Sequence, residues 1–559
     1  MRLIETHRHQ MFPILEPAQI ETARHFASGP AQEFAPYETV FDAGQRGVPM
    51  WFVLKGSMEV MRRDALNNEA PIIAHGPGQF SGEVSQLAGR EALAAAHAGA
   101  EGCTVIPFDA GHVRALLIGS AEIGEIVMRA LILRRVALIE EGGVGSVIIG
   151  EAGSREVLRL QDFLRRNGYP YKLLDANKDE EGRGIVQRLG VFSQELPLVL
   201  CPNGSILKRP TEAEAGACLG ITPELDTNKV YDVAIVGAGP AGLAAAVYAS
   251  SEGLSVLALD EHAFGGQAGA SSRIENYLGF PNGISGMALA GRAYNQALKF
   301  GVEIAIPIEV SRLDCQEAKK KPGSSMQLQF TNGAVAQART VVIASGARYR
   351  RPAIPNLSVF EGRGISYWAS PVEAKLCEGE EVALIGGGNS AGQAVAFLAP
   401  KVKRLHLFVR GPGLETSMSR YLIERIAALP NVVLHPGTEV ISLEGNETTG
   451  LTGATFRNRS SGESHKCSLR HLFLFIGADP NISWLNGCVD VDAKGFVITG
   501  VKSSGSSLAK SRSVLPLETS LPGVFAIGDV RAGSTKRLAA AVGEGAAVVA
   551  QIHSTLAHV

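Results

Sequence analysis

No two cysteines of this sequence form a C-x-x-C pair. The seven cysteines are spread from Cys103 to Cys488. Their spacing excludes the usual sequence form of a dithiol redox centre or a zinc knuckle, and we predict no metal site. The sequence also lacks any apolar run near the roughly 20 residues that cross a membrane, and it begins without a stretch of the signal-peptide type. These absences predict a cytoplasmic protein without a membrane partner.

Neither sign of charge dominates the sequence. The 53 Lys and Arg residues are offset by 55 Asp and Glu residues, and no long basic run appears. A nucleic-acid partner is therefore not expected. A chain of 559 residues is too long for one hydrophobic core, and it predicts about three to four domains. The 64 glycines gather in short clusters that look like nucleotide-binding turns.

Short apolar runs broken by Gly, Asn and Asp fill residues 40–110, with helical periodicity on both sides. They predict a small antiparallel β-barrel with flanking helices over residues 1–140. The stretch GQFSGEVSQLAG resembles the phosphate-binding segment of the cyclic-nucleotide-binding domain family, with Gly82 and Glu83 as the candidate ligand pocket. In that family an arginine about ten residues later pairs with the cyclic phosphate, but here Ala92 stands there and Arg90 comes early. We therefore expect a docking or dimerisation domain rather than one that binds a cyclic nucleotide.

Residues 145–222 alternate between strand and helix patterns. The segments VGSVIIGE, YPYKLLDAN and LPLVLCPNG are typical of strands, and VLRLQDFLRRNG is typical of a helix. This order resembles the thioredoxin/glutaredoxin fold, with Pro197 where that family places a cis-proline. The family's dithiol would follow the first strand, where this sequence has Ala152-Gly153-Ser154-Arg155. Without a thiolate there is no disulfide exchange, so the resemblance implies a docking module in which Cys201 is a small buried hydrophobe.

A buried strand, YDVAIV, leads directly into Gly237-x-Gly239-x-x-Gly242 and a helix of small residues. The next strand, LSVLALD, ends at Asp260. Strand, glycine turn, helix and a later acid together form the dinucleotide-binding fingerprint. The glycines let the chain approach a pyrophosphate at the helix N-terminus, and the acid accepts hydrogen bonds from a ribose. The sequence therefore predicts a dinucleotide site here.

A second copy of the fingerprint occurs in EVALIGGGNSAGQAVAFLA, with Gly386, Gly388 and Ala391 in the corresponding positions. The strand that follows, RLHLFVR, ends at Arg410 and offers no acid. An acid there would repel the 2′-phosphate of NADP, whereas a basic residue attracts it. We therefore predict that this second site prefers NADPH over NADH.

Further motifs resemble the low-molecular-weight thioredoxin reductase family over residues 228–557, namely FGGQ, RIENYLGFPNGISG, FIGADPN and FAIGDVRAGSTKRLAAAVGEGAAV. The resemblance implies an α/β fold of the pyridine nucleotide-disulfide oxidoreductase type, with two Rossmann-like domains, and a homodimer. The FAD domain would comprise residues 228–345 and 471–559, around an NAD(P)H domain at 346–470. The implied FAD-binding residues are Gly237, Gly239, Pro240, Ala241, Gly242, Asp260, Gly265, Gln267, Asn276, Gly346, Gly528 and Asp529. The implied NADPH-binding residues are Gly386, Gly388, Asn389, Ser390, Ala391 and Arg410.

The sequence departs from this family at the chemistry. Members carry a C-x-x-C pair just before the second fingerprint, but here Trp368 and Pro371 stand in the cysteine positions, and Cys377 has no partner nearby. The resemblance then implies that NADPH reduces FAD and that electrons pass directly to an external acceptor, such as a quinone, a ferredoxin or flavodoxin, or a disulfide partner. Tyr367 and Trp368 would lie near the flavin. The alternative is a flavoprotein that senses the NADPH balance and whose N-terminal domains dock a partner or bind a small regulatory ligand.

Overall fold

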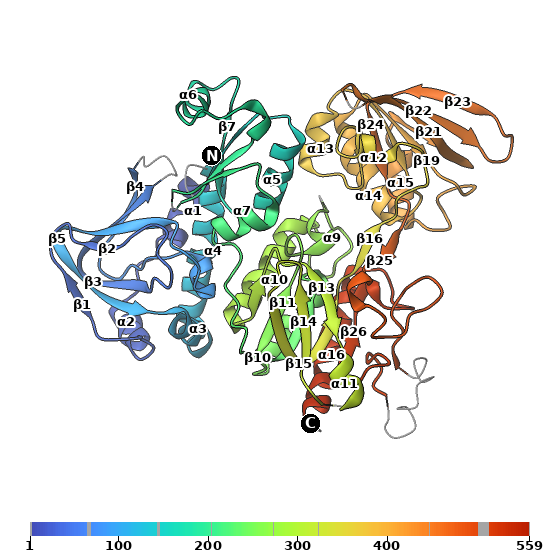
Figure 1. Ribbon diagram of the computed structural model, residues 1–559. Helices are drawn as coiled ribbons and strands as arrows, with labels where there is room; N and C mark the ends of the chain where they lie inside the picture. Colours follow the sequence, from blue (N-terminus) through green and yellow to red (C-terminus); the bar gives the residue numbers. More distant parts are fainter. Residues whose placement is uncertain are drawn as a thin grey trace.

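The computed structural model describes residues 3–63, 69–141, 146–202, 204–271, 273–321, 323–446, 448–500 and 514–557. These residues form four units that can be followed by colour in Figure 1. An N-terminal unit is followed by a second unit and then by a central unit. A further inserted unit interrupts the central unit, which resumes near the C-terminus.

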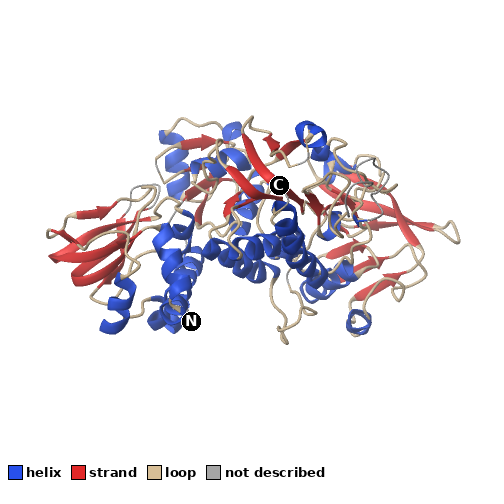
Figure 2. Ribbon diagram, turned by 90° about the horizontal axis from the view of Figure 1, so that it is seen from below, coloured by secondary structure: helices blue, strands red, loops and turns tan. Residues whose placement is uncertain are grey.

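The N-terminal unit is a five-stranded antiparallel sheet packed on helices. Its antiparallel strands and flanking helices agree with the prediction, while the described strands pair as a sheet and not as the predicted closed barrel. Its strand order is β1-β5-β3-β4, with β2 also pairing with β5. In its core, the ring of Phe52 packs against those of Phe80 and Phe108, with centroids 5.3 and 4.6 Å apart. Figure 2 shows this sheet at one end of the molecule. The elements are α1 (Leu3–Met11), α2 (Pro17–Arg24), β1 (Gln32–Phe34), β2 (Thr39–Phe41), β3 (Met50–Arg63), β4 (Glu69–His75), η1 (Val84–Ala88), β5 (Ala94–Phe108), α3 (Ala110–Gly119) and α4 (Ala121–Glu141).

The second unit has a four-stranded sheet of order β7-β6-β8-β9, in which only β6 and β7 are parallel. Helix α5 begins at the N-cap Ser154 and buries Val157, Leu160 and Leu164 on one face, because residues three and four apart lie together on a helix. The Leu196–Pro197 peptide bond is cis, at the predicted position. The elements are β6 (Ser146–Gly150), α5 (Arg155–Arg166), β7 (Tyr171–Asp175), α6 (Glu180–Arg188), η2 (Ser193–Glu195), β8 (Leu198–Leu200), β9 (Ile206–Lys208) and α7 (Glu212–Cys218).

The central unit is built on a seven-stranded sheet of order β12-β11-β10-β15-β14-β13, with β26 from the C-terminal part pairing with β15. Strands β12, β11, β10, β15 and β26 are parallel. The first strand and helix elements are β10 (Val230–Val236), α8 (Pro240–Ser251), β11 (Val256–Leu259), α9 (Gly266–Gly269), α10 (Gly286–Phe300), β12 (Glu303–Ala305), β13 (Val310–Asp314), α11 (Gln316–Lys320), β14 (Met326–Phe330) and β15 (Val335–Ile343). The C-terminal part adds η4 (Ser483–Leu485), β26 (Val524–Ala526), η7 (Gly528–Val530) and α16 (Leu538–Leu556).

The inserted unit has a parallel sheet of order β17-β24-β18-β19-β20 and a three-stranded antiparallel sheet, β21-β22-β23. Its predicted end at residue 470 is too early, because β24 pairs in parallel with β18 inside this unit. The chain returns through β25, which pairs with β16 to form the connector between the units. The elements are β16 (Ala347–Tyr349), α12 (Leu357–Phe360), β17 (Ile365–Ser366), α13 (Pro371–Leu376), β18 (Glu381–Ile385), α14 (Asn389–Leu398), η3 (Ala399–Lys401), β19 (Arg404–Phe408), α15 (Arg420–Ala427), β20 (Val432–His435), β21 (Thr438–Asn446), β22 (Gly450–Asn458), β23 (Ser464–Ser468), β24 (His471–Leu474) and β25 (Ala478–Pro480).

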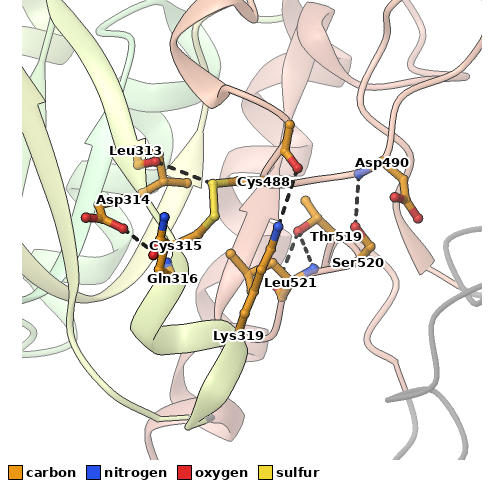
Figure 3. Close-up of a disulfide and its surroundings, with 11 residues drawn as sticks. Leu313, Asp314, Cys315, Gln316, Lys319, Cys488, Asp490, Thr519, Ser520 and Leu521 are labelled. Atoms are coloured by element: carbon orange, nitrogen blue, oxygen red, sulfur yellow. Dashed lines mark hydrogen bonds between the residues drawn. A yellow bond between two sulfur atoms is a disulfide. The ribbon is translucent and has the colours of Figure 1, made fainter.

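Two disulfides correct the expectation drawn from the cysteine spacing. Cys201 bonds to Cys218, with Cα atoms 6.1 Å apart, so it is not the isolated hydrophobe that the sequence suggested. Cys315 bonds to Cys488 across a sequence separation of 173 residues and ties the two parts of the central unit together (Figure 3). Cysteine spacing along the chain reveals only local pairs such as C-x-x-C. Each of these two disulfides instead joins cysteines that folding brings together.

The N-terminal and central units share one hydrophobic core. Leu116 and Leu131 of the first belong to the same buried cluster as Ala297 and Val302 of the second. Helix α10 lies between them, and the guanidinium of Arg90 sits 6.0 Å from the centroid of the Tyr294 ring on that helix. Among the helices that the structure describes, none combines the length and the apolar character needed to cross a bilayer.

Candidate active site

At the first glycine fingerprint, two segments of the chain approach each other closely. Gly237 follows β10 with φ +112°, and a Cβ atom there would lie 2.2 Å from the carbonyl oxygen of Ala344. A Cβ atom on Gly242 would lie 1.8 Å from the oxygen of Gly237. No side chain fits at either position. Because both residues are glycines, β10 can turn directly into α8. Gly239 caps this helix, and the first N–H groups of a helix are suited to hold a pyrophosphate.

Asp260 stands at the carboxyl end of β11, beside that turn. Its Oδ2 atom accepts a hydrogen bond from the N–H of Ala238 at 2.8 Å. Its Oδ1 atom accepts from the N–H groups of His262 and Ala263 at 3.0 and 3.1 Å. These bonds fix the carboxylate next to the fingerprint, where the remaining lone pairs of its oxygens can accept from a ribose.

The FGGQ loop covers the fingerprint turn. Gly265 and Gly266 both have positive φ angles, and a Cβ atom on Gly266 would lie 3.1 Å from the Cα atom of Gly239. The side-chain amide of Gln267 donates to the carbonyl of Ala347 in β16. The loop therefore forms one wall of the cradle and reaches the connector to the inserted unit.

The C-terminal part closes the opposite side of the cradle. Gly528 follows β26, and a Cβ atom there would lie 2.9 Å from the Cβ atom of Ala241 in α8. The N–H of Gly528 donates to Glu544 of α16 at 2.7 Å. Burial raises the pKa of the neighbouring Asp529, and the charge of Lys536 partly opposes this rise. Asp529 is half-buried and directly follows Gly528, and its role toward FAD stays a prediction.

The predicted FAD residues meet at the carboxyl edge of the central sheet, with one exception. Gly346 follows β15 and accepts a hydrogen bond from the N–H of Asn481 at 3.1 Å, which places it at the same edge. Asn276 is exposed in the loop closed by the Ile274–Ile284 bridge, and its role stays a prediction. A turn without room for side chains, a helix N-terminus and an acid at the next strand end fit the pyrophosphate and ribose of FAD.

The second fingerprint repeats this geometry in the inserted unit. Gly386 follows β18 with φ +153°, and a Cβ atom there would lie 2.5 Å from the carbonyl oxygen of Phe475. Gly388 caps α14. The side-chain oxygen of Asn389 accepts from the N–H of Ser419 at 2.7 Å and ties α14 to the start of α15. Arg410 is exposed just after β19, at the carboxyl edge where a 2′-phosphate would lie.

The segment around Trp368, where the family resemblance would place a C-x-x-C pair, offers no reactive thiol. The hydroxyl of Tyr367 donates to Glu361 at 2.6 Å, and its ring stacks on that of Tyr349 in β16 with centroids 6.3 Å apart. The indole N–H of Trp368 donates to Glu373 of α13 at 3.0 Å. Cys377 is fully buried, and burial raises the pKa of its thiol to about 11. The thiol is therefore protonated at neutral pH and is not a nucleophile.

The candidate pocket of the N-terminal unit is occupied by arginines of α4, which sequence reasoning missed. Arg134 donates to the carbonyl of Gly82 at 2.9 Å and lies buried between the rings of Phe12 and Phe80. Arg135 lies 3.6 Å from the carboxylate of Glu83. Both arginines lie far from the pocket in sequence, so no local motif could point to them. In the described part of the chain, no group of three His, Cys, Asp or Glu side chains is placed to hold a metal ion.

Two dinucleotide cradles on one chain define the class: a flavoprotein that binds FAD and NAD(P)H. Comparison with known families agrees, because the model of the pyridine nucleotide-disulphide oxidoreductases matches residues 231–545. The chain belongs to this family. The model of the cyclic nucleotide-binding domain matches residues 31–119.

Curated relatives cover the same region. The chain is 34% identical over 340 residues to an alkyl hydroperoxide reductase protein of Escherichia coli, covering 60% of this chain and 60% of that one. It is 32% identical over 327 residues to thioredoxin reductase of Ureaplasma parvum, covering 58% and 96%. A NADH dehydrogenase of Bacillus subtilis is 30% identical over 324 residues, covering 58% of each chain. The chain thus spans about three fifths of the length of the hydroperoxide reductase protein.

Solved structures support the fold. Thioredoxin reductase of T. acidophilum is 28% identical, with a TM-score of 0.51, and covers 58% of this chain and 99% of its own. That of Lactococcus lactis, at 24% identity and a TM-score of 0.53, shares the fold. The predicted fold class and the FAD and NAD(P)H cofactors are confirmed.

Proposed function

We propose that this protein is an NADPH-dependent FAD oxidoreductase that reduces an external acceptor without a redox-active disulfide of its own. Two complete dinucleotide cradles carry this proposal, together with the absence of a cysteine pair at Trp368 and Pro371. When bound, FAD would supply the redox chemistry, which is to accept a hydride from NADPH and to pass electrons to the acceptor. The glycine turns and helix N-termini bind the two cofactors, and Arg410 selects the 2′-phosphate.

The Cys315–Cys488 disulfide does not substitute for the missing pair. Cys315 directly follows Asp314 of β13. Across the sheet, Asp314 pairs with Gln327 of β14, which in turn pairs with Gln337 near the start of β15. The fingerprint turn follows Val236 of β10, which pairs with Ile343 at the end of β15. At about 3.3 Å per residue the strand between these levels is about 20 Å long. Both cysteines are also buried, at 6% exposure each. We therefore infer a structural role for this crosslink and a direct transfer to the acceptor.

The second unit supports the proposal as a docking module of thioredoxin type. Its β-α-β-α-β-β-α order and the cis bond before β8 support that resemblance. Ser154 caps α5 where the family has its dithiol, and Cys201 is fully buried. In the family, disulfide exchange starts from an accessible thiolate at the start of this helix, where Ser154 stands. The Cys201–Cys218 disulfide joins the end of β8 to α7 instead, and its Cys201 sulfur is fully buried. We therefore infer that this unit binds rather than reduces a partner.

Anaerobic mixing of the purified protein with NADPH, and separately with NADH, tests the proposal. Loss of visible flavin absorbance with NADPH is expected, and the rate with NADH should be lower. Turnover should then follow with a quinone, a flavodoxin or a disulfide protein, and alkylation of free thiols should leave it unchanged. A flavin that keeps its absorbance in excess NADPH would contradict the proposal, and so would activity abolished by thiol alkylation.

The continuous core between the N-terminal and central units favours a second function, sensing of the NADPH balance. Helix α10 packs on α8, which carries the fingerprint, and also on α3 of the N-terminal unit. A change at the cradle would therefore reach the N-terminal unit through packed helices. Calorimetry with cyclic nucleotides, compared between the oxidised and the NADPH-reduced protein, separates the two functions. Rapid turnover with any acceptor contradicts a purely sensory role.

A further inference from the structure

The end of helix α5, outside the region that matches the oxidoreductase family, contacts the FAD cradle. The Nη2 atom of Arg166 donates to the carbonyl oxygen of Gly266 at 3.0 Å. The amide of Asn167 donates to the carbonyl oxygen of His262 at 2.9 Å. Glu212 of α7 lies 3.4 Å from the ring of the same histidine. The second unit thus contacts both ends of the segment 262–266, which includes the first three residues of the FGGQ loop.

Gly266 is the point of this loop that lies against the pyrophosphate turn. A Cβ atom on it would lie 3.1 Å from the Cα atom of Gly239, the residue that caps α8. A displaced loop would therefore change the shape of the cradle at the helix N-terminus. A charged donor holds a carbonyl more firmly than a neutral one does, so the guanidinium of Arg166 is suited to prevent that displacement.

Arg166 is half-buried between the second unit, the FGGQ loop and the connector strand β16. Its Nε atom is buried without a hydrogen-bond partner. Its charge also acts on Tyr349 of the connector, whose pKa is raised by burial and lowered in part by Arg166. A cation with an unsatisfied buried donor is costly, and a neutral side chain would fill the space without this cost. The next residue toward the N-terminus, Arg165, also has a buried Nε atom without a hydrogen-bond partner. It differs in its contacts, since it pairs with Asp162 of its own helix at 2.6 Å and not with the FGGQ loop.

We propose that Arg166 is a positioning residue of the FAD site, which makes the second unit a part of that site. The residue acts through Gly266 and holds the FGGQ loop against the cap of α8. The proposal rests on the FAD cradle of the proposed function but not on NADPH or on the electron acceptor.

Reconstitution of the apo protein with FAD tests this role, with flavin fluorescence and the visible spectrum as readouts. Arg166→Ala should raise the dissociation constant of FAD about tenfold, which corresponds to the loss of one hydrogen bond to a charged group. It should also alter the visible spectrum of the bound flavin. Arg166→Lys keeps a charged donor and should recover most of the affinity. Arg165→Ala is the matched control on the same turn and should leave both readouts unchanged.

Two results would overturn the proposal. One is unchanged affinity and spectrum in Arg166→Ala, and the other is an equal loss in Arg165→Ala, which would indicate a general effect of the helix. If Arg166→Ala does not fold, as judged by circular dichroism of the apo form, Arg166→Lys and Arg166→Gln decide, because only the lysine variant should keep the affinity. A failure of NADPH to bleach the flavin would contradict the proposed function and leave this test intact.

Discussion

Removal of the Cys315–Cys488 disulfide should destabilise the central unit by about 5 kcal/mol. The crosslink joins residues 173 apart in sequence, and the closed loop contains the whole inserted unit. In the chain-entropy model, restriction of a loop of this length in the unfolded state is worth roughly 5 kcal/mol at 25 °C. The shorter Cys201–Cys218 loop, with a separation of 17 residues, corresponds to about 3 kcal/mol in the same model.

Urea unfolding of the oxidised protein and of the double variant Cys315→Ala/Cys488→Ala measures this difference. Trp484 provides a local fluorescence signal, because it is buried in the same hydrophobic cluster as Cys488. The double variant Cys201→Ala/Cys218→Ala is the control with the shorter loop, and its midpoint should fall by less. Equal midpoints for the protein and the Cys315→Ala/Cys488→Ala variant would refute the reasoning, and so would a larger loss in the control.

Three further predictions concern the cofactor sites and pH. Gly237→Ala should abolish FAD binding, because its Cβ atom would meet the carbonyl of Ala344 at 2.2 Å, whereas Gly291→Ala has open space and should bind FAD normally. Arg410→Ala should raise the KM for NADPH at least tenfold, through loss of a charged contact, and leave that for NADH unchanged; equal effects on both would contradict the assignment. Burial lowers the pKa of His435 to about 4, while an unfolded histidine titrates near pH 6.5. The neutral ring therefore stabilises the fold above about pH 6.5, and this contribution is lost as the pH falls toward 4. Urea midpoints at about pH 7.5 and pH 5 should show that loss, and a His435→Gln variant should reduce it.

The sequence by itself determined the two dinucleotide sites. Gly237 and Gly386 each follow a buried strand and precede a helix, and the contacts that forbid a side chain there arise within one strand–turn–helix segment and its neighbouring strand. The strand, glycine turn and helix of each site are adjacent in the chain, so the motif can be found from the sequence even though the neighbouring strand comes from a distant segment. The same holds for the absence of a redox pair before the second fingerprint, since a C-x-x-C motif is local.

Contacts between residues far apart in the chain, by contrast, become visible only in the tertiary structure. Three contacts join segments that are far apart in the chain: the disulfide between Cys315 and Cys488, and the hydrogen bonds of Arg134 to the Gly82 carbonyl and of Arg166 to the Gly266 carbonyl. An arginine on a helix has the same sequence signature whether it faces water or a buried carbonyl. Its partner is set by how the units pack against one another, and the packing depends on the whole folded surface rather than on any local pattern.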